Sequence, residues 1–91
     1  MRVPTIHLNG TPGQRLFVAL SLARDAVNVA RDAVRATAPN GRDYYLQPGN
    51  AIGEAEAEHR TRIAKLEAVS DELHGILIHV YEALEEQKAR K

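Results

Sequence analysis

Side chains that could recognise a ligand are concentrated in one short connector between two long stretches of helical periodicity. Arg42 offers a planar fork of donors that suits a phosphate or a carboxylate. Tyr44 and Tyr45, half of the four aromatic residues of the chain, offer flat faces and hydroxyl groups. Asn40 and Gln47 can each donate to and accept from the edge of a heterocycle. These five side chains predict a binding site for a small nucleotide-like ligand.

One connector is too small to hold such a ligand tightly. Stacking contributes on the order of 1 to 3 kcal/mol per base, whereas a sub-micromolar complex needs more than about 8 kcal/mol. Further groups are therefore expected from His7 and Asn9 near the N-terminus and from His59. In a single hairpin His7 and Asn9 fall at the far end of the first helix. We therefore expect an antiparallel neighbouring subunit to bring them to the connector.

A structural interpretation of the same residues remains open. Tyr44 and Tyr45 then plug the end of a helical bundle, while Arg42 bonds to helix carbonyls and Asp43 caps a helix. Tyr45 fits this interpretation better than Arg42 and Tyr44 do. For His59 the structural interpretation is a seam histidine hydrogen-bonded in a polar layer.

Catalysis and metal binding are not expected. Ser21 and Ser70 lie within helical patterns without a plausible base beside them, and the chain contains no cysteine. His59, His74 and His79 lack the i, i+4 spacing that places two imidazoles on one metal ion. We therefore predict a non-enzymatic protein with no catalytic residue, no metal and no cofactor.

Two helices with coiled-coil periodicity must position the connector. Thr11, Pro12 and Gln14 predict the start of the first, with Thr11 as N-cap, and this helix spans residues 11–38. Pro39 ends it, because the residue before a proline resists the helical conformation. The predicted seam alternates spacings of four and three. Its members are Leu16, Leu20, Ala23, Val27, Ala30 and Val34.

The second helix is predicted over residues 51–88, with Asn50 as its N-cap, and the connector spans 39–50. Its seam has the same alternation: His59, Ile63, Leu66, Ser70, Leu73, Leu77, Val80 and Leu84. Three residues widen this stripe: Val69, Ile76 and Ala83. Residues 1–10 form an extended lead-in that is expected over the last part of the second helix, at Leu77, Val80, Tyr81 and Leu84.

The resulting fold class is all-α: one domain, an antiparallel helical hairpin with a short extended N-terminal segment. A lone hairpin buries one stripe per helix, which scarcely offsets the conformational entropy of about 90 ordered residues. We therefore expect a homo-oligomer in which hairpins form a four-helix or larger bundle.

Charge and hydropathy limit the kinds of partner that we expect for this chain. Twelve basic and twelve acidic residues cancel, so a general electrostatic nucleic-acid binder is not expected. Arg24, Arg31 and Arg35 do cluster on the first helix, but Asp25 and Asp32 lie beside them. No signal peptide or membrane-length apolar run occurs, so we expect a cytoplasmic protein without a membrane partner. Residues 1–48 carry a net charge of +3 and residues 49–91 a net charge of −3, which favours antiparallel packing of the two halves.

Three segments carry a resemblance to a known group: Thr5-Ile6-His7-Leu8-Asn9-Gly10-Thr11, Ala38-Pro39-Asn40-Gly41-Arg42-Asp43-Tyr44-Tyr45, and the second helix from Glu58-His59 to Leu73. Over nearly its whole length the chain resembles small uncharacterised helical-hairpin proteins of tailed bacteriophages and prophages. It is also similar in size and hairpin design to phage proteins that oligomerise and sequester cyclic nucleotide signals of bacterial immunity. The resemblance implies a bacterial host cell, and no catalytic residues carry over from that group.

Two functional hypotheses follow. The first is an oligomeric, anti-defence nucleotide sponge that binds a small signalling ligand through the connector. The second is a helical interaction module that inhibits or bridges a host or phage protein through the broad apolar stripe of the second helix.

Overall fold

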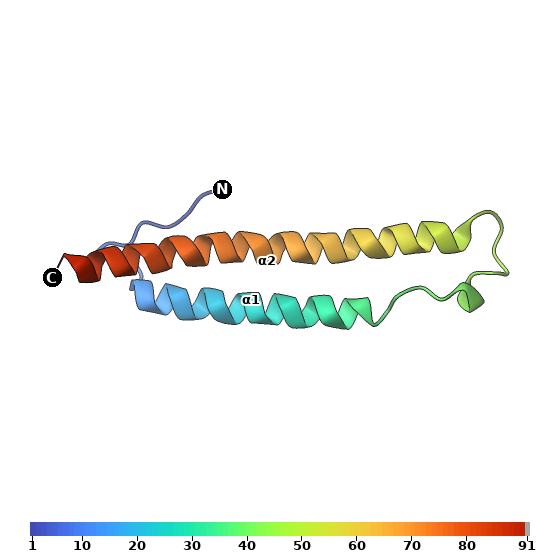
Figure 1. The fold of residues 1–91 in the computed structure, drawn as a ribbon, viewed down its shortest axis with the longest axis horizontal. Coiled ribbons are helices and arrows are strands. Elements are labelled where there is room, and N and C mark those ends of the chain that lie inside the picture. The colour runs from blue at the N-terminus through green and yellow to red at the C-terminus, as the bar shows by residue number, and fades with distance from the viewer. Residues whose placement is uncertain (91) are drawn as a thin grey trace.

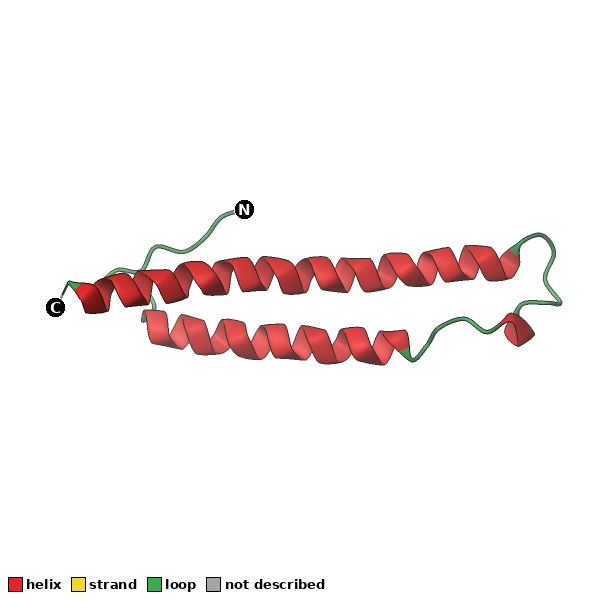
Figure 2. Ribbon diagram, viewed as in Figure 1, coloured by secondary structure: helices red, strands yellow, loops and turns green. Residues whose placement is uncertain are grey.

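A computed structural model describes residues 1–90 as an antiparallel pair of helices joined at one end (Figure 1). Helix α1 spans Gly13–Arg35 and helix α2 spans Ala51–Ala89, with a single 3-10 turn, η1, at Gly41–Asp43 between them. Residues 1–90 contain no β-strand (Figure 2), and the rod they form measures 67 × 20 × 20 Å. The prediction of an all-α helical hairpin is therefore confirmed.

Helix α1 begins later than predicted, and Thr11 is not its N-cap. Pro12 occupies that position with an extended backbone, φ −54° and ψ 135°, and no side chain caps the helix. The first turn closes instead through the N–H of Leu16, which donates to the carbonyl of Pro12 at 3.1 Å. Because Pro12 has no N–H of its own, it suits the residue before the first helical turn.

Helix α1 also ends three residues earlier than predicted. Ala36 is the C-cap, and the next two N–H groups, of Thr37 and Ala38, donate to carbonyls three residues back at 2.9 and 3.2 Å. The chain thus tightens before Pro39, which excludes the preceding residue from helical geometry. The connector consequently starts closer to the middle of the rod than the sequence pattern indicated.

Helix α2 starts where the sequence predicted it. The Asn50 side chain accepts a hydrogen bond from the N–H of Gly53 at 3.3 Å, so Asn50 is the N-cap. Gly49 has φ +73°, a left-handed conformation that suits glycine and lets the chain turn sharply into the helix. With 39 residues against 23, α2 is about 58 Å long and α1 about 35 Å. The connector runs beside the part of α2 that α1 does not reach (Figure 1).

The seam predicted for α2 is confirmed along its whole length. All eight of its members are buried or half-buried, from His59 at the connector end to Leu84 at the other. Val80 is fully buried, and Ile76 and Ala83 extend the covered stripe to one side, whereas Val69 is exposed.

The seam predicted for α1 is only partly right. Leu16, Leu20, Val27 and Val34 are half-buried as expected, but the alanines at positions 23 and 30 are exposed. Arg24 and Arg31 are half-buried in their place, one residue or about 100° further around the helix. Helix α1 is therefore rolled so that its more polar edge meets α2.

Specific contacts explain this roll. The Ser70 hydroxyl donates to Asn28 Oδ1 at 2.7 Å across the seam, and the Phe17 and Tyr81 ring centroids lie 6.2 Å apart. Arg35 and Glu67 form an exposed ion pair at 3.6 Å, in line with the opposite charges of the two halves. Such an exposed pair contributes about 1 kcal/mol or less, so the polar and aromatic contacts matter more.

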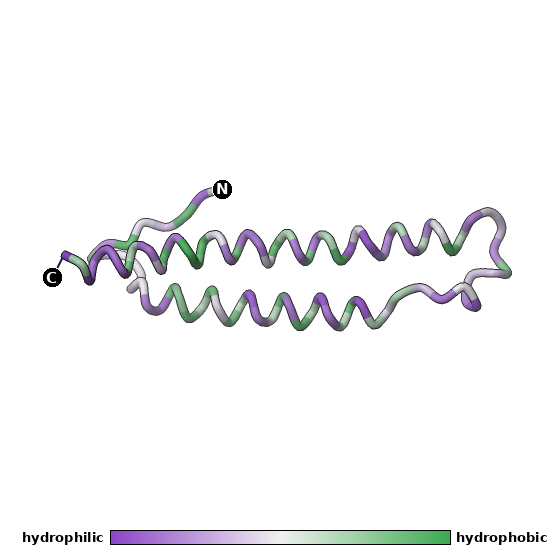
Figure 3. The backbone as a smooth tube through the Cα atoms, in the orientation of Figure 1, coloured by the Kyte–Doolittle hydropathy of each residue, from purple (hydrophilic) through white to green (hydrophobic). Residues whose placement is uncertain are grey.

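The lead-in folds back along the last part of α2, on the side away from α1 (Figure 1). His79 Nε2 lies 2.9 Å from the carbonyl oxygen of Pro4, and Met1 reaches Gly75. At its other end, Ile6 and Leu84 pack so closely on Gly13 that a Cβ atom there would lie 2.7 Å from Leu84. This part of α2 is its most apolar segment (Figure 3), so the lead-in covers surface that α1 leaves bare. The position predicted for the lead-in is confirmed at Leu84.

Within residues 1–90, neither helix combines the length and the apolar character that crossing a membrane requires.

Candidate functional site

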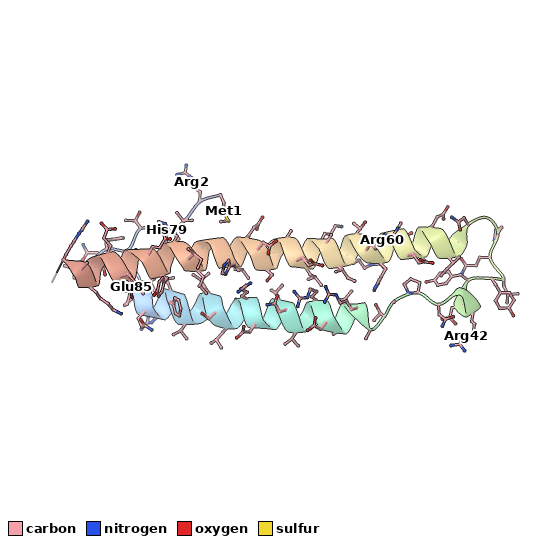
Figure 4. The ribbon with its side chains drawn as sticks, in the orientation of Figure 1. Met1, Arg2, Arg42, Arg60, His79 and Glu85 are labelled. Atoms are coloured by element: carbon pink, nitrogen blue, oxygen red, sulfur yellow. The ribbon has the colours of Figure 1, made fainter. Side chains whose placement is uncertain are left out.

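The connector holds its recognition residues at the tip of the rod in a short, hydrogen-bonded turn. Asn40 caps η1: its Oδ1 accepts from the backbone N–H of Arg42 at 2.9 Å and from the Arg42 Nε at 3.3 Å. The second bond orients the guanidinium, whose terminal nitrogens extend away from α2 (Figure 4). The Asn40 Oδ1 is therefore occupied in positioning Arg42.

The two tyrosines of the connector have different environments. The N–H groups of both Tyr44 and Tyr45 donate to the carbonyl of Gly41 at 3.1 Å, which fixes the backbone of the turn. Tyr44 is half-buried, whereas Tyr45 is 75% exposed and the following residue, Leu46, is 84% exposed. The tip thus presents a phenol ring and an aliphatic side chain to solvent next to an exposed Arg42.

This geometry corrects the structural interpretation of the connector. In a single chain Tyr45 is exposed and does not cover the end of the hairpin, whereas Tyr44 is half-buried there. Asn40, and not Asp43, caps the turn, and Arg42 bonds to the Asn40 side chain where helix carbonyls were expected. Helix α1 ends at Arg35, and an extended stretch of connector separates its last carbonyls from Arg42.

The remaining candidate residues do not join the tip within one chain. His7 and Asn9 are exposed in the lead-in at the opposite end of the 67 Å rod, as expected for a single hairpin. His59 is buried in the seam of α2, about two and a half turns after its N-cap, where the structural interpretation placed it. Gln47 is exposed in the connector, and its N–H donates to the carbonyl of Tyr44 at 3.0 Å. A single chain therefore brings together only the connector residues.

A shallow hollow lies at the end of the rod remote from the tip. It has a volume of about 550 Å³ and lies between the lead-in, the first turn of α1 and the end of α2. His7 is one of its lining residues, together with Ile6, Leu8, Leu84 and Gln87. The lining is mainly apolar, so this hollow suits an aliphatic side chain better than an anion.

The arginines of α1 do not form a free basic surface. The Nε of Arg24 is buried in the seam without a hydrogen-bond partner in residues 1–90. Arg31 bonds to Asn28 and Asp32, and Arg35 pairs with Asp32 and Glu67. These contacts favour the ion-paired interpretation over nucleic-acid binding. In the part of the chain that the structure covers, no cluster of acidic and histidine side chains could hold a metal ion.

Two features of the surface were missed from the sequence. Leu46 gives no signal in the sequence, because a lone leucine in a connector belongs to no periodic pattern. The exposed side of α1 is not apparent because two of its alanines, Ala23 and Ala30, belong to the seam that the sequence predicts. A signal for it was present: alanines at positions 19, 26 and 33 repeat every seven residues outside the predicted seam.

Comparisons with protein-family models, with curated proteins and with solved structures gave no match for this chain.

Proposed function

We propose that this protein is a non-enzymatic helical interaction module that binds another protein through the tip of its connector. The observation that carries the proposal is the exposure of Tyr45 and Leu46 beside Arg42 on a turn of fixed backbone. Tyrosine and arginine are enriched among residues that contribute most to protein interfaces. A turn that is already ordered also loses less conformational entropy on binding than a flexible loop does.

The shape of the rod supports this role. The tip lies far from both termini of the described chain, so a partner can approach it without meeting the lead-in (Figure 1). The turn also projects from the end of the rod (Figure 4), which suits insertion into a groove of a partner better than the enclosure of a small molecule. From the resemblance to phage and prophage proteins, we propose a host or phage protein as the partner, in the cytoplasm of the bacterial cell.

Capture of a partner from host lysate tests the proposal, provided that the captured protein is then purified and its affinity measured directly. A variant carrying Arg42→Ala and Tyr45→Ala should weaken that affinity by about 2 kcal/mol or more. A variant carrying Arg60→Ala and Val69→Ala, an exposed arginine and an exposed large apolar residue of α2, is the control and should bind normally. Equal affinities of the two variants would exclude the tip as the binding surface.

A second candidate function is the sequestration of a small nucleotide-derived anion at the same tip. It is favoured by the Arg42 guanidinium, whose Nε is held by Asn40 while its terminal nitrogens remain outward for a phosphate. One open turn supplies too little binding energy for it, so it requires groups from a neighbouring subunit.

Calorimetric titration with cyclic dinucleotides, cyclic oligonucleotides and ADP-ribose derivatives separates the two candidates. Sub-micromolar binding that is lost in Arg42→Ala would favour the sponge function. Silence across the panel, together with a protein partner that requires the tip, would favour the interaction module.

A further inference from the structure

The side of α1 that faces away from α2 is apolar from Val18 to Ala33. Five alanines, with spacings of four and three, form its centre, and all five are exposed: Ala19, Ala23, Ala26, Ala30 and Ala33. Three larger side chains border them: Val18, Leu22 and Val29, of which Leu22 is 64% and Val29 69% exposed. We call these eight residues the outer face of α1. The alternation of four and three is the spacing by which one helix packs against another.

The seam with α2 does not account for this face. Helix α1 turns Arg24, Asn28 and Arg31 toward α2, while the alanines one residue before Arg24 and Arg31 remain outside. A helix that had only α2 as a neighbour would bury its most apolar side against α2. Between the seam and the outer face lie Leu16, Leu20, Val27 and Val34, which are half-buried. This arrangement is typical of a helix with two neighbours, whose largest side chains point between them.

The surface area of the chain indicates how much a second neighbour would cover. The rod exposes 6877 Å². Folded monomers of 10.0 kDa expose about 5,200 Å² by the empirical scaling of surface with mass. The excess of about 1,600 Å² is about twice the area that each partner buries in a standard protein interface, roughly 800 Å². One interface along α1 can therefore remove much of the excess.

We infer that the outer face of α1 binds the same face of a second copy of this chain, with the two α1 helices antiparallel about a twofold axis at Ala26. The sequence of this face is complementary to itself in that register. Leu22 then lies opposite the partner subunit's Ala30, and Val29 lies opposite the partner subunit's Ala23. Leu22 and Val29, the two most exposed large side chains of this face, thus each meet an alanine, which allows the two helices to interdigitate closely. The two hairpins together form a four-helix bundle.

This register has a consequence for the connector. Helix α1 has 13 residues before Ala26 and nine after it, so the partner subunit's α1 extends about four residues past Arg35. The start of the partner subunit's α1 therefore lies beside the first residues of the connector. The dimer does not depend on the proposed function.

Cysteine cross-linking tests the register, because the natural chain contains no cysteine. Ala26→Cys places two thiols at the twofold axis, where Cα atoms can come within the roughly 4.4 to 6.8 Å that a disulfide requires. Under mild oxidation at micromolar concentration we expect it to form dimers on the order of tenfold faster than Ala57→Cys. Ala57 is an exposed alanine on α2 and serves as the matched control. Equal rates, or faster cross-linking through Ala57, would overturn the inference.

A charge variant provides the second arm. Leu22→Glu with Val29→Glu should raise the dissociation constant of the dimer about 100-fold or more, because a packed interface excludes unpaired charges. Both residues are exposed in one chain, so circular dichroism should still report a helical protein. The control, Thr61→Glu with Ala64→Glu, changes two exposed positions of α2 and should leave the dimer intact. If the charge variant sediments as a dimer, the inference is wrong. If a tip variant loses its partner while the dimer stays intact, that result bears on the proposed function alone.

Discussion

Asn40 decides how the connector presents its side chains. By accepting hydrogen bonds from both the backbone N–H and the Nε of Arg42, it orders the turn and directs the guanidinium outward. The sequence could predict that Arg42, Tyr44 and Tyr45 share one connector, because they are neighbours in the chain. It could not predict that Asn40 is a capping residue or that Tyr45 is the exposed tyrosine. Those features depend on where α1 ends, and helix ends are the least determined part of a periodic pattern.

Arg24 carries a buried donor that finds no acceptor, since its Nε lies in the seam without a partner in the described chain. An unsatisfied buried donor costs about 1 to 3 kcal/mol. Arg24→Met keeps the aliphatic length and removes the donor, so we expect the free energy of unfolding in urea to rise by about 1 kcal/mol. Arg60→Met, an exposed position of α2, is the control and should change it little. A lower free energy of unfolding for Arg24→Met would contradict this prediction. It would mean that contacts of the Arg24 terminal nitrogens stabilise the fold by more than the unsatisfied Nε costs.

Ser70 and Asn28 form a polar contact across the seam at 2.7 Å. Ser70→Ala removes the hydroxyl that donates to Asn28, so we expect the free energy of unfolding in urea to fall by about 1 kcal/mol. Replacing both residues, Asn28→Leu with Ser70→Ala, should recover most of that loss, because the hydroxyl and the amide are removed together while Arg31 keeps its contact with Asp32. Thr61→Ala removes an exposed hydroxyl and sets the baseline. If the double variant were less stable than Ser70→Ala, the contact would have a larger role than hydrogen bonding alone.

Helix α2 could be predicted almost completely from the sequence, whereas α1 could not. In α2 the large aliphatic residues lie on one stripe, so periodicity alone identifies the buried side. In α1 apolar residues extend over more than half of the circumference, and periodicity cannot say which part meets α2. Asn28 and Phe17, which contact Ser70 and Tyr81, settle the roll through contacts between residues distant in sequence. Such pairings are not visible in a single periodic pattern.

The lead-in is attached to α2 at a small number of points, of which His79 is the most specific. Its Nε2 contacts the carbonyl of Pro4 at 2.9 Å, and Met1 lies further along against Gly75. We expect His79→Ala to release the first residues, so that the nuclear Overhauser contact between the Met1 methyl group and the Gly75 α protons is lost. His74→Ala changes an exposed histidine on the same helix and should preserve that contact. Its persistence in His79→Ala would show that apolar packing alone holds the lead-in.

As a whole, the molecule has too little interior for its length. One large aliphatic side chain, Val80, is fully buried, and apolar residues remain exposed on α1, at the tip and along α2. Each fully buried large aliphatic contributes about 1.5 to 3 kcal/mol, whereas ordering a residue costs at least about 1 kcal/mol. The expectation of an oligomer came from this balance in the sequence. The structure adds a particular surface, the outer face of α1, through which the proposed assembly would form.

Sedimentation equilibrium of the unmodified chain across nanomolar to micromolar concentrations tests the central claim most directly. If hairpins pair through the outer face of α1, the fitted mass should be twice 10.0 kDa at micromolar concentration and should fall toward 10.0 kDa on dilution. The melting temperature should rise with protein concentration in parallel, because a partner that binds only the folded chain stabilises it. A mass of 10.0 kDa throughout, with a cooperative melting transition that does not depend on concentration, would contradict the account.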